Sequence, residues 1–263
     1  MPETYEMHRL AGQDTEILRA GAGAPIVLLH GSADSPAAFR DVVPLIAPSR
    51  TVWAPGLPPI DVDPREREVF ALDIDLPWLD ALMDTSGARS LVAHSYGALL
   101  ALRWALAHPG RLDRLVLGEP IAWGVAQGDV PTTERLAVLR RTCFDPFRVG
   151  ETAVAIAALV DYWNGAGFWA ALPGRIRAGL VATAPRTCAE VASGWSDRTS
   201  AAELASLVVP TTMLCGAHTT AESMVVSRLI AAALPDASLI VLQGAGHQFL
   251  RSHPAEVAAA ALR

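Results

Sequence analysis

The chain has 263 residues, of which 51% are hydrophobic and 18% are charged, and its formal net charge is −6. This is enough apolar material for one large α/β domain, and because no basic residues are clustered, neither nucleic acid nor an anionic membrane is an expected partner. No apolar run reaches the roughly 20 residues of a membrane span, and residues 1–10 lack the charged and apolar segments of a secretion signal, so we expect a cytoplasmic protein.

The first part of the chain alternates short apolar runs with amphipathic ones. Continuous apolar runs are typical of buried parallel strands, and an apolar period near 3.6 residues is typical of helices. Ser35 and Pro36 stand where the N-cap and first turn of a helix are expected. In chain order the predicted elements are a polar hairpin over 6–20, a strand over 26–29, a helix over 36–47, a strand over 50–54, an irregular proline-rich loop over 55–64 and a helix over 72–83.

The next segment changes its period in the middle. Residues 90–94 indicate a buried strand, and residues 98–108 indicate a largely buried helix. Between them, A-H-S-Y-G matches the strand-to-helix turn G-x-S-x-G, with Ala93 at the first glycine position. Such a turn would present Ser95 at the carboxyl end of the sheet, beside the free N–H groups of a helix N-terminus, which suits attack on an acyl carbon. The alternative is that Ser95 only caps the helix.

The second half of the chain loses its strand signals and then recovers them. A strand over 112–117 leads into G-E-P, and residues 121–205 carry helical segments with many Trp, Gly and Pro. We interpret 121–205 as a helical cap inserted into a core of residues 1–120 and 206–263. The remaining predicted elements are helices over 133–141, 150–163 and 168–180, a strand over 211–215, a helix over 221–234, a strand over 238–242 and a last helix from residue 254.

Polar residues fall at the carboxyl ends of several predicted strands. Ser32, Ser95, Glu119 and His247 are placed in this way, and in a parallel sheet such positions meet at one edge. The segments LLHGSADS, AHSYGALLAL, VLGEP, LVVPTTMLCGA and GAGHQFLRSHPAEV resemble the α/β-hydrolase family, in the family's order. The resemblance covers most of the chain outside the cap. It implies an α/β-hydrolase fold, with a mostly parallel central sheet, helices on both faces and an inserted helical cap.

The histidines are candidates for the base that a serine nucleophile needs. His247, in the loop after the last predicted strand, is the best candidate. His94 adjoins Ser95, but its side chain should point away from the hydroxyl, so we expect it to pack. His30 fits a structural hydrogen bond better than a catalytic role.

The oxyanion hole of such an enzyme is expected to consist of backbone N–H groups. Tyr96 follows the nucleophile and would supply one of them. The family resemblance places the second at Ser32, with Gly31 as the alternative position. Ser32 could also be an ordinary turn residue.

The acid departs from the commonest family pattern. Many relatives place an Asp three residues after a glycine that follows the strand before last, where this chain has Gly216 and Thr219. A hydroxyl cannot stabilise an imidazolium as a carboxylate does. Haloalkane dehalogenases and zearalenone lactonases take their acid from the strand end at which Glu119 stands, and the lactonases resemble this chain in that region, so we predict Glu119. Glu222 is the rival, although the dipole of its helix also explains it, and Asp34 is a more remote alternative.

Aromatic side chains are concentrated in the predicted cap. We expect an apolar, ring-tolerant pocket with substrate contacts from Trp123, Tyr162, Trp163 and Trp169, although packing of the cap explains each of them as well. The chain has no nucleotide-binding or zinc motif, and its three cysteines form no CxxC pair. We therefore expect no cofactor, no metal and no disulfide framework.

The predicted activity is hydrolysis of a carboxylic ester or lactone of a small hydrophobic substrate, through a Ser-His-Glu triad and an acyl-enzyme. Dehalogenases and epoxide hydrolases of the family would carry Asp in place of Ser95, so the serine favours acyl transfer to water. The alternatives are hydrolysis of a carbon–carbon bond in a β-diketone, perhydrolysis, or a non-catalytic member of the fold with a decayed triad, which Thr219 would favour. A homodimer is left open.

Overall fold

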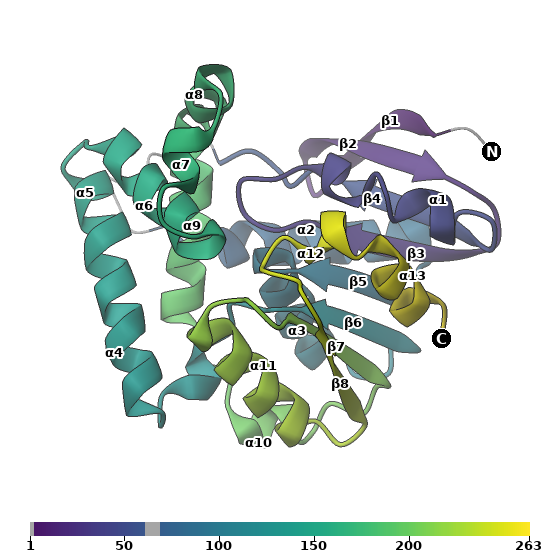
Figure 1. The fold of residues 1–263 in the computed structure, drawn as a ribbon. Coiled ribbons are helices and arrows are strands. Elements are labelled where there is room, and N and C mark those ends of the chain that lie inside the picture. Colours follow the sequence, from purple (N-terminus) through teal and green to yellow (C-terminus); the bar gives the residue numbers. More distant parts are fainter. Residues whose placement is uncertain (1–2, 61–68) are drawn as a thin grey trace.

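The computed structural model describes residues 3–60 and 69–263, and Figure 1 shows its fold. At its centre is an eight-stranded sheet with the order β1-β2-β4-β3-β5-β6-β7-β8. The described strands are β1 (Thr4–Leu10), β2 (Gln13–Ala20), β3 (Ala24–Leu29), β4 (Arg50–Pro55), β5 (Ser90–His94), β6 (Arg114–Gly118), β7 (Thr211–Gly216) and β8 (Ala237–Leu242). β2 pairs antiparallel with both β1 and β4, and the other pairs are parallel. The predicted mostly parallel α/β sheet is confirmed.

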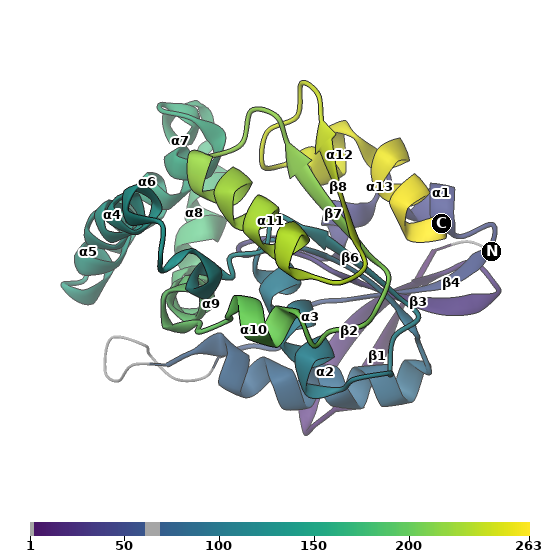
Figure 2. The same ribbon diagram turned by 90° about the horizontal axis from the view of Figure 1, so that it is seen from below.

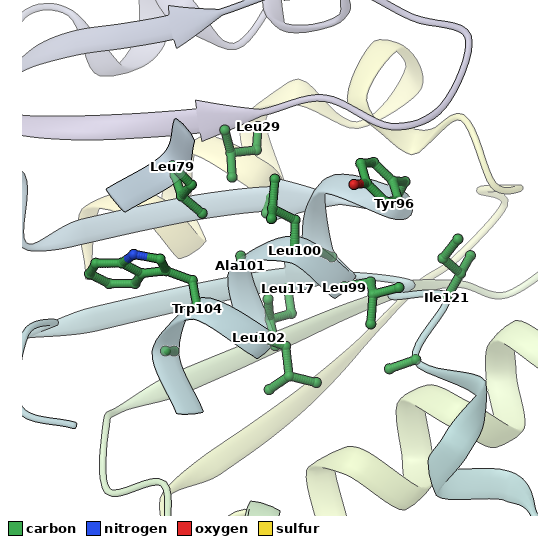
Figure 3. Packing of buried hydrophobic residues seen from close by; sticks show 14 of the residues in the cluster. Leu29, Leu79, Tyr96, Leu99, Leu100, Ala101, Leu102, Trp104, Leu117 and Ile121 are labelled. Atoms are coloured by element: carbon green, nitrogen blue, oxygen red, sulfur yellow. The ribbon is translucent and has the colours of Figure 1, made fainter. Parts of the chain in front are cut away.

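The central strands bury side chains on both faces of the sheet, because consecutive residues point to opposite sides. In β5, Leu91 and Ala93 belong to one core cluster and Val92 belongs to another. Figure 3 shows part of the larger cluster, including Leu29 and Leu100. Helices α2 (Ala71–Ser86), α3 (Tyr96–Ala107) and α11 (Ala221–Ala233) contribute to the larger cluster, and α1 (Val43–Ile46), α12 (Phe249–Ser252) and α13 (Pro254–Leu262) to the smaller one (Figure 2).

The helix predicted over 36–47 is broken in the structure. A 3-10 turn covers Pro36–Phe39, and α1 begins only at Val43. Pro44 explains the break, because in a continuous helix its ring would clash with the carbonyl of Arg40 and it has no N–H to donate. Ser35 precedes the turn in an extended conformation, and its side chain makes no capping hydrogen bond. The apolar face is nevertheless buried as predicted.

The segment between β6 and β7 is helical throughout its regular elements, all of which lie in described residues. Its α-helices are α4 (Val130–Leu139), α5 (Asp145–Arg148), α6 (Thr152–Asn164), α7 (Phe168–Ala171), α8 (Gly174–Ala182), α9 (Ala184–Ser196) and α10 (Ala201–Leu204). The single helix predicted over 168–180 is wrong, because Leu172 is extended and Pro173 separates α7 from α8. α9 was not predicted, because the apolar face of its sequence APRTCAEVASGWS consists mostly of small residues, which are weaker signals than Leu, Ile or Phe. The bounds 121 and 205 of the cap stay a prediction.

Two further expectations concern the proline-rich loop over 55–64 and the absence of a membrane span. Residues 56–60 are irregular, as predicted for the proline-rich loop, whereas residues 61–64 of that loop lie outside the described residues. Within the described part of the chain, no helix is long and apolar enough to cross a membrane.

The parallel register brings several strand ends together. His94 pairs with Gly118, so β5 and β6 end side by side, and Gly118 pairs in turn with Leu214 near the end of β7. The residues that directly follow β5 and β6 are Ser95 and Glu119. The fold therefore collects polar side chains from distant parts of the sequence at one edge of the sheet.

Candidate active site

Ser95 lies on a sharp turn between β5 and α3. Its backbone has φ 54° and ψ −117°, a conformation that residues with a side chain rarely adopt, and only 3% of its surface is exposed. The turn depends on glycines at two close contacts. A Cβ on Gly97 would stand 2.4 Å from the carbonyl oxygen of His30, and a Cβ on Gly31 would stand 2.9 Å from the Cβ of Ser95. The small residues of the sequence motif therefore allow the backbones to pass within contact distance.

Ser95, His247 and Glu119 form one continuous hydrogen-bonded chain. The Nε2 atom of His247 is 3.2 Å from the Oγ atom of Ser95, and its Nδ1 atom is 2.5 Å from the Oε2 atom of Glu119. Because an ionised carboxylate only accepts hydrogen bonds, Nδ1–H donates to Glu119 and Nε2 is left to accept from the serine hydroxyl. All three side chains are buried. The structure thus brings together the three residues that the sequence singled out.

Glu119 is held by donors from a neighbouring loop as well as by the histidine. The N–H of Gly216 donates to its Oε1 atom at 2.7 Å, and the hydroxyl of Thr219 donates to its Oε2 atom at 2.6 Å. Burial raises the pKa of this carboxyl, but the adjacent His247 and the three hydrogen bonds outweigh burial, so the pKa lies below its usual range. Glu119 is therefore ionised near neutral pH.

Thr219 is a site residue whose contact with Glu119 was not predicted. It was noted because many relatives have an aspartate at its position, and the missing carboxylate counted against catalysis. In the structure, the Thr219 hydroxyl is a hydrogen-bond donor to Glu119. A carboxylate at position 219 would face Glu119 with a like charge, so the threonine is matched to an acid that follows β6.

The rival acids have other partners. Glu222 forms an ion pair with Arg135 and accepts a hydrogen bond from the Tyr162 hydroxyl at 3.0 Å. Asp34 pairs with Arg251 at 3.0 Å, near the mouth of the site. Neither carboxylate has a described contact with the imidazole of His247.

Two further histidines are buried next to the site. His94 donates from Nε2 to the backbone carbonyl of His247 at 2.9 Å, and its ring lies edge-on to Phe249. Burial, followed by the charge of His247, lowers the pKa of His94 to about 3, so this ring is neutral at working pH. His30 donates from Nδ1 to the carbonyl of Gly31 and accepts at Nε2 from the N–H of Leu57. Both histidines hold loops of the site in place, and neither bonds to the serine hydroxyl.

The two expected oxyanion positions are next to Ser95. Tyr96 is the first residue of α3, and the N–H groups of a first helical turn have no partner within the helix. Ser32 lines the same cleft as Ser95, in the loop that Gly31 allows to approach the nucleophile. The assignment of these N–H groups to an oxyanion stays a prediction.

A cleft of about 410 Å³ opens over the serine. Its core side carries mostly polar side chains, and its cap side carries mostly apolar ones, with Asn164 and Thr187 as polar exceptions. The core side is lined by Ser32, Asp34, Ser95, His247, Gln248 and Arg251, and the cap side by Leu159, Val160, Trp163, Phe168, Leu172, Ile176 and Leu180. This division favours a substrate with an apolar body and one reactive polar group.

Of the four aromatic residues expected to bind substrate, Trp163 lines this cleft. Tyr162 faces a neighbouring cleft of about 680 Å³ on the side of Thr219 and Thr220. Trp123 is 6% exposed and packs against Trp195. Trp169 packs against a third buried cluster, which lies within the predicted cap. The expectation of substrate contacts is therefore unsupported for Trp123 and Trp169, because packing within the protein accounts for both rings.

A buried charge network that was not predicted lies behind the nucleophile turn. Arg186 of α9 pairs with Asp75 of α2 and with Glu190, and the Tyr96 hydroxyl donates to Asp75 at 2.6 Å. Burial raises the pKa of the Asp75 and Glu190 carboxyls, and the charge of Arg186 offsets only part of this rise. A signal was present in the sequence, since Asp75 interrupts the apolar face of its helix. The network joins the cap to the residue that follows the nucleophile.

No group of three or more His, Cys, Asp and Glu side chains in the described residues could hold a metal ion. The free thiols of Cys143, Cys188 and Cys215 are buried, and burial raises the pKa of Cys143 to about 11 and of the other two to about 12. These cysteines belong to the packed interior.

A sequence profile of the alpha/beta hydrolase family matches residues 26–260. The 2-hydroxymuconate semialdehyde hydrolase of Pseudomonas sp. (strain CF600) is 33% identical over 135 residues, which cover 48% of this chain and 45% of that protein. The alignments with the first curated relatives all cover less than half of those proteins' own length.

Solved structures resemble the chain over nearly its whole length. The epoxide hydrolase CorEH without ligand has a TM-score of 0.74 at 19% identity, and the match covers 99% of this chain and 98% of that one. The 2-hydroxy-6-oxo-6-phenylhexa-2,4-dienoate hydrolase from Rhodococcus sp. strain RHA1 has a TM-score of 0.70 at 19% identity, with 94% and 93% covered. At these identities the likeness concerns the fold alone. Together with the profile, which spans most of the sequence, it leads to one conclusion: the chain belongs to the alpha/beta hydrolase family.

Proposed function

We propose that this protein is a serine hydrolase that cleaves a carboxylic ester or lactone of a hydrophobic substrate through an acyl-enzyme. The observation that carries the proposal is the chain of contacts from Ser95 Oγ to His247 Nε2, at 3.2 Å, and from His247 Nδ1 to Glu119, at 2.5 Å. A nucleophile, a base and a group that orients the base are the parts that activate a hydroxyl near neutral pH.

In the proposed reaction, His247 takes the hydroxyl proton while Ser95 Oγ attacks the carbonyl carbon. The oxyanion that forms accepts hydrogen bonds from the backbone N–H groups of Tyr96 and Ser32. The intermediate collapses when His247 returns the proton to the leaving alkoxide oxygen, which leaves the acyl group on Ser95. Water, activated by the same imidazole, then releases the acid. Glu119 stays ionised throughout and stabilises the imidazolium.

The serine narrows the choice among the reactions of the family. Haloalkane dehalogenases and epoxide hydrolases use an aspartate at this position, whose carboxylate displaces halide or opens the epoxide. Ser95 has no carboxylate to offer, so the fold shared with CorEH does not bring that activity with it. Acyl transfer to water suits the hydroxyl.

The second candidate is hydrolysis of a carbon–carbon bond next to a ketone. Two proteins similar to this chain carry names that indicate dienoate or semialdehyde hydrolysis. In that reaction the leaving group is a carbon, which must also receive a proton. The cleft lining near Ser95 has no described acid other than those of the triad and Asp34, which is paired with Arg251, so we rank ester or lactone hydrolysis first.

The nucleophile is tested with a fluorophosphonate probe and a panel of p-nitrophenyl esters. Wild type should be labelled, and Ser95→Ala should lose labelling and turnover by several orders of magnitude while its circular dichroism is unchanged. His247→Ala should be nearly as damaging, and the double variant hardly worse, because the two residues act as a unit.

Turnover of Ser95→Ala above a tenth of wild type would contradict the assignment. Losses that multiply in the double variant would show that the two residues do not share a mechanism. A parallel panel of lactones and of a dienoate ketone separates the two candidate reactions, since a carbon–carbon hydrolase should prefer the ketone in kcat/KM.

A further inference from the structure

The indole of Trp163 is stacked on the imidazole of His247. The two ring centroids are 5.4 Å apart and the planes are inclined by 20°. Trp163 belongs to α6 of the cap, whereas His247 follows β8 of the sheet. We propose that Trp163 is a positioning residue for His247, which holds the plane of the imidazole and stabilises its protonated form through the face of the indole. The proposal rests on the proposed function, in which His247 becomes charged during the reaction.

The face of an indole is the most favourable aromatic partner for a cation, and a separation below about 6 Å is within its range. In the proposed reaction, the imidazole of His247 is neutral before it accepts the serine proton, and it is an imidazolium in the transition state. The attraction therefore grows as the reaction proceeds. An interaction that is stronger in the transition state than in the ground state raises kcat rather than only lowering KM.

The surroundings of the imidazole leave this role to Trp163 and Glu119. The titratable or charged side chains that contact it or line a cleft with it are Glu119 after β6, His94 at the end of β5, Tyr162 in α6, His218 after β7, Asp34 after β3 and Arg251 in α12. Burial lowers the pKa of His94 to about 3, so that ring carries no charge. Arg251 is paired with Asp34 at 3.0 Å. Burial raises the pKa of Tyr162, which stays a neutral phenol.

Trp163 also lies between two clefts. The cleft of about 410 Å³ over Ser95 and the cleft of about 680 Å³ beside Thr219 are both lined by Trp163 and by His247. The imidazole is only 4% exposed, so the stacked face is largely removed from water. Exclusion of water strengthens an attraction between a cation and an aromatic ring.

The test compares Trp163→Leu with Trp163→Phe. Leucine keeps an apolar side chain over the ring but has no π face, whereas phenylalanine keeps a π face of weaker attraction for cations. In Trp163→Leu, we expect kcat to fall roughly 3- to 30-fold with a smaller change in KM, and Trp163→Phe to retain most of the wild-type rate. The acid limb of the pH–kcat/KM profile should move to lower pH by roughly half a unit to 1.5 units in the leucine variant.

A measurement that does not depend on catalysis accompanies the kinetics. The Cε1–H signal of His247, identified by its loss in His247→Gln, is followed by NMR as pH falls. Protonation should require a lower pH in Trp163→Leu than in wild type, with Trp163→Phe between them. If the leucine variant does not fold by circular dichroism, Trp163→Met takes its place beside Trp163→Phe.

Each result decides the proposal. An unchanged titration overturns it even if kcat falls, because Trp163 would then act only through substrate binding or packing. A shift to higher pH also overturns it, because the indole would then act by dehydrating the imidazole. If Ser95→Ala retains activity, the proposed function fails, and the titration still reports whether the indole stabilises the imidazolium.

Discussion

Glu119 accepts hydrogen bonds from three donors, and each of them fixes a different part of the site. The Gly216 N–H ties the acid to the end of β7, the Thr219 hydroxyl ties it to the following loop, and His247 receives its orientation from it. The backbone of Glu119 itself has φ 43°, in the left-handed region that residues with a side chain seldom adopt. This turn directs the carboxylate back across the strand ends toward the imidazole.

Neutralising this acid should remove most of the activity without changing the shape of the side chain. We expect Glu119→Gln to lower kcat by roughly two to four orders of magnitude, because the amide cannot stabilise the imidazolium. The matched control is Glu222→Gln. Since Glu222 pairs with Arg135 and Tyr162, its change should lower stability while kcat stays close to wild type. Steady-state kinetics on one ester measure both variants.

The opposite ranking, with Glu222→Gln inactive and Glu119→Gln mildly affected, would place the acid after β7.

The contribution of Glu119 to the free energy of unfolding should depend on pH, as measured by urea unfolding. The pKa of Glu119 is lowered in the folded state, so its contribution to stability is present above the unfolded value of about 4.3 and is lost as pH falls through the folded pKa. The stability difference between wild type and Glu119→Gln should therefore stay constant from pH 7 to about pH 4.3 and shrink below that value.

At the scale of elements, the turn between β5 and α3 depends on close backbone contacts. A Cβ on Gly97 would meet the carbonyl oxygens of His30 and Leu29 at 2.4 and 2.7 Å, and backbone atoms cannot move aside as a flexible side chain can. The helix therefore has to shift if this glycine is replaced. Ala93, at the other end of the motif, is tolerated as it stands.

We expect Gly97→Ala to destabilise the protein by about 1–3 kcal/mol or more, as is usual for overpacking, and to slow fluorophosphonate labelling of Ser95. Gly179→Ala is the matched control, because Gly179 lies in α8 with nothing within 4 Å of an added Cβ. The control should be neutral or more stable by up to about 1 kcal/mol. Urea unfolding measures the stability of both. Equal stability and equal labelling of the two variants would show that the turn has room that the structure does not indicate.

Two of the predicted helices are interrupted at prolines in the structure. The strands could be predicted because buried parallel strands are continuous apolar runs, and their ends could be placed by the polar residues that follow. Two predicted helices were broken instead, at Pro44 and Pro173, because an apolar period continued across each proline while the backbone could not. α9 was not predicted for another reason: its buried face is made of small residues such as Ala189 and Ala192, and the ion pairs of Arg186 and Glu190 add to that packing.

The proximity of Ser95, His247 and Glu119 could be predicted from the sequence, because these residues follow strand ends and parallel strands end at one edge. The partners of the acid could not, since the hydrogen bond from Thr219 depends on how two loops approach each other. The cap was harder still. Its aromatic residues give no signal that separates Trp163, which faces the imidazole, from Trp123, which is packed inside.

For the whole molecule, the network around Arg186 is a buried ionic link between the predicted cap and the sheet domain. Its guanidinium side chain is 15% exposed and forms ion pairs with both Asp75 and Glu190, which are 0% and 2% exposed. It also donates to the carbonyl of Pro58 at 2.7 Å. Removing one partner of a buried ion pair leaves an uncompensated charge, which is more damaging than the loss of the pair as a whole.

We expect Arg186→Met to lower the free energy of unfolding by about 3–5 kcal/mol at pH 7. Arg89→Met is the matched control, because Arg89 and Asp113 form an ion pair with 53% and 64% exposed side chains, and such pairs contribute little. Burial already raises the pKa of Asp75 and of Glu190, and a carboxyl with a raised folded pKa favours the folded state at low pH. The deficit of Arg186→Met should therefore shrink as pH falls from 7 toward 4, as measured by urea unfolding. A deficit no larger than that of Arg89→Met, or one that grows on acidification, would contradict this account.

The position of Glu119 also has an evolutionary consequence. The chain leaves the sheet at the end of β6 and returns at Thr211, which pairs with Leu115 on the strand that it left. A segment whose two ends meet on neighbouring strands can be replaced by that of a relative without moving the strands. Here, however, the acid is the first residue after the exit strand. A donor segment from a relative whose acid follows β7 would arrive without it, and the recipient, with Thr219, could not replace it. Under the proposed function, an exchange of this segment would therefore preserve the triad only if the splice were made after Pro120.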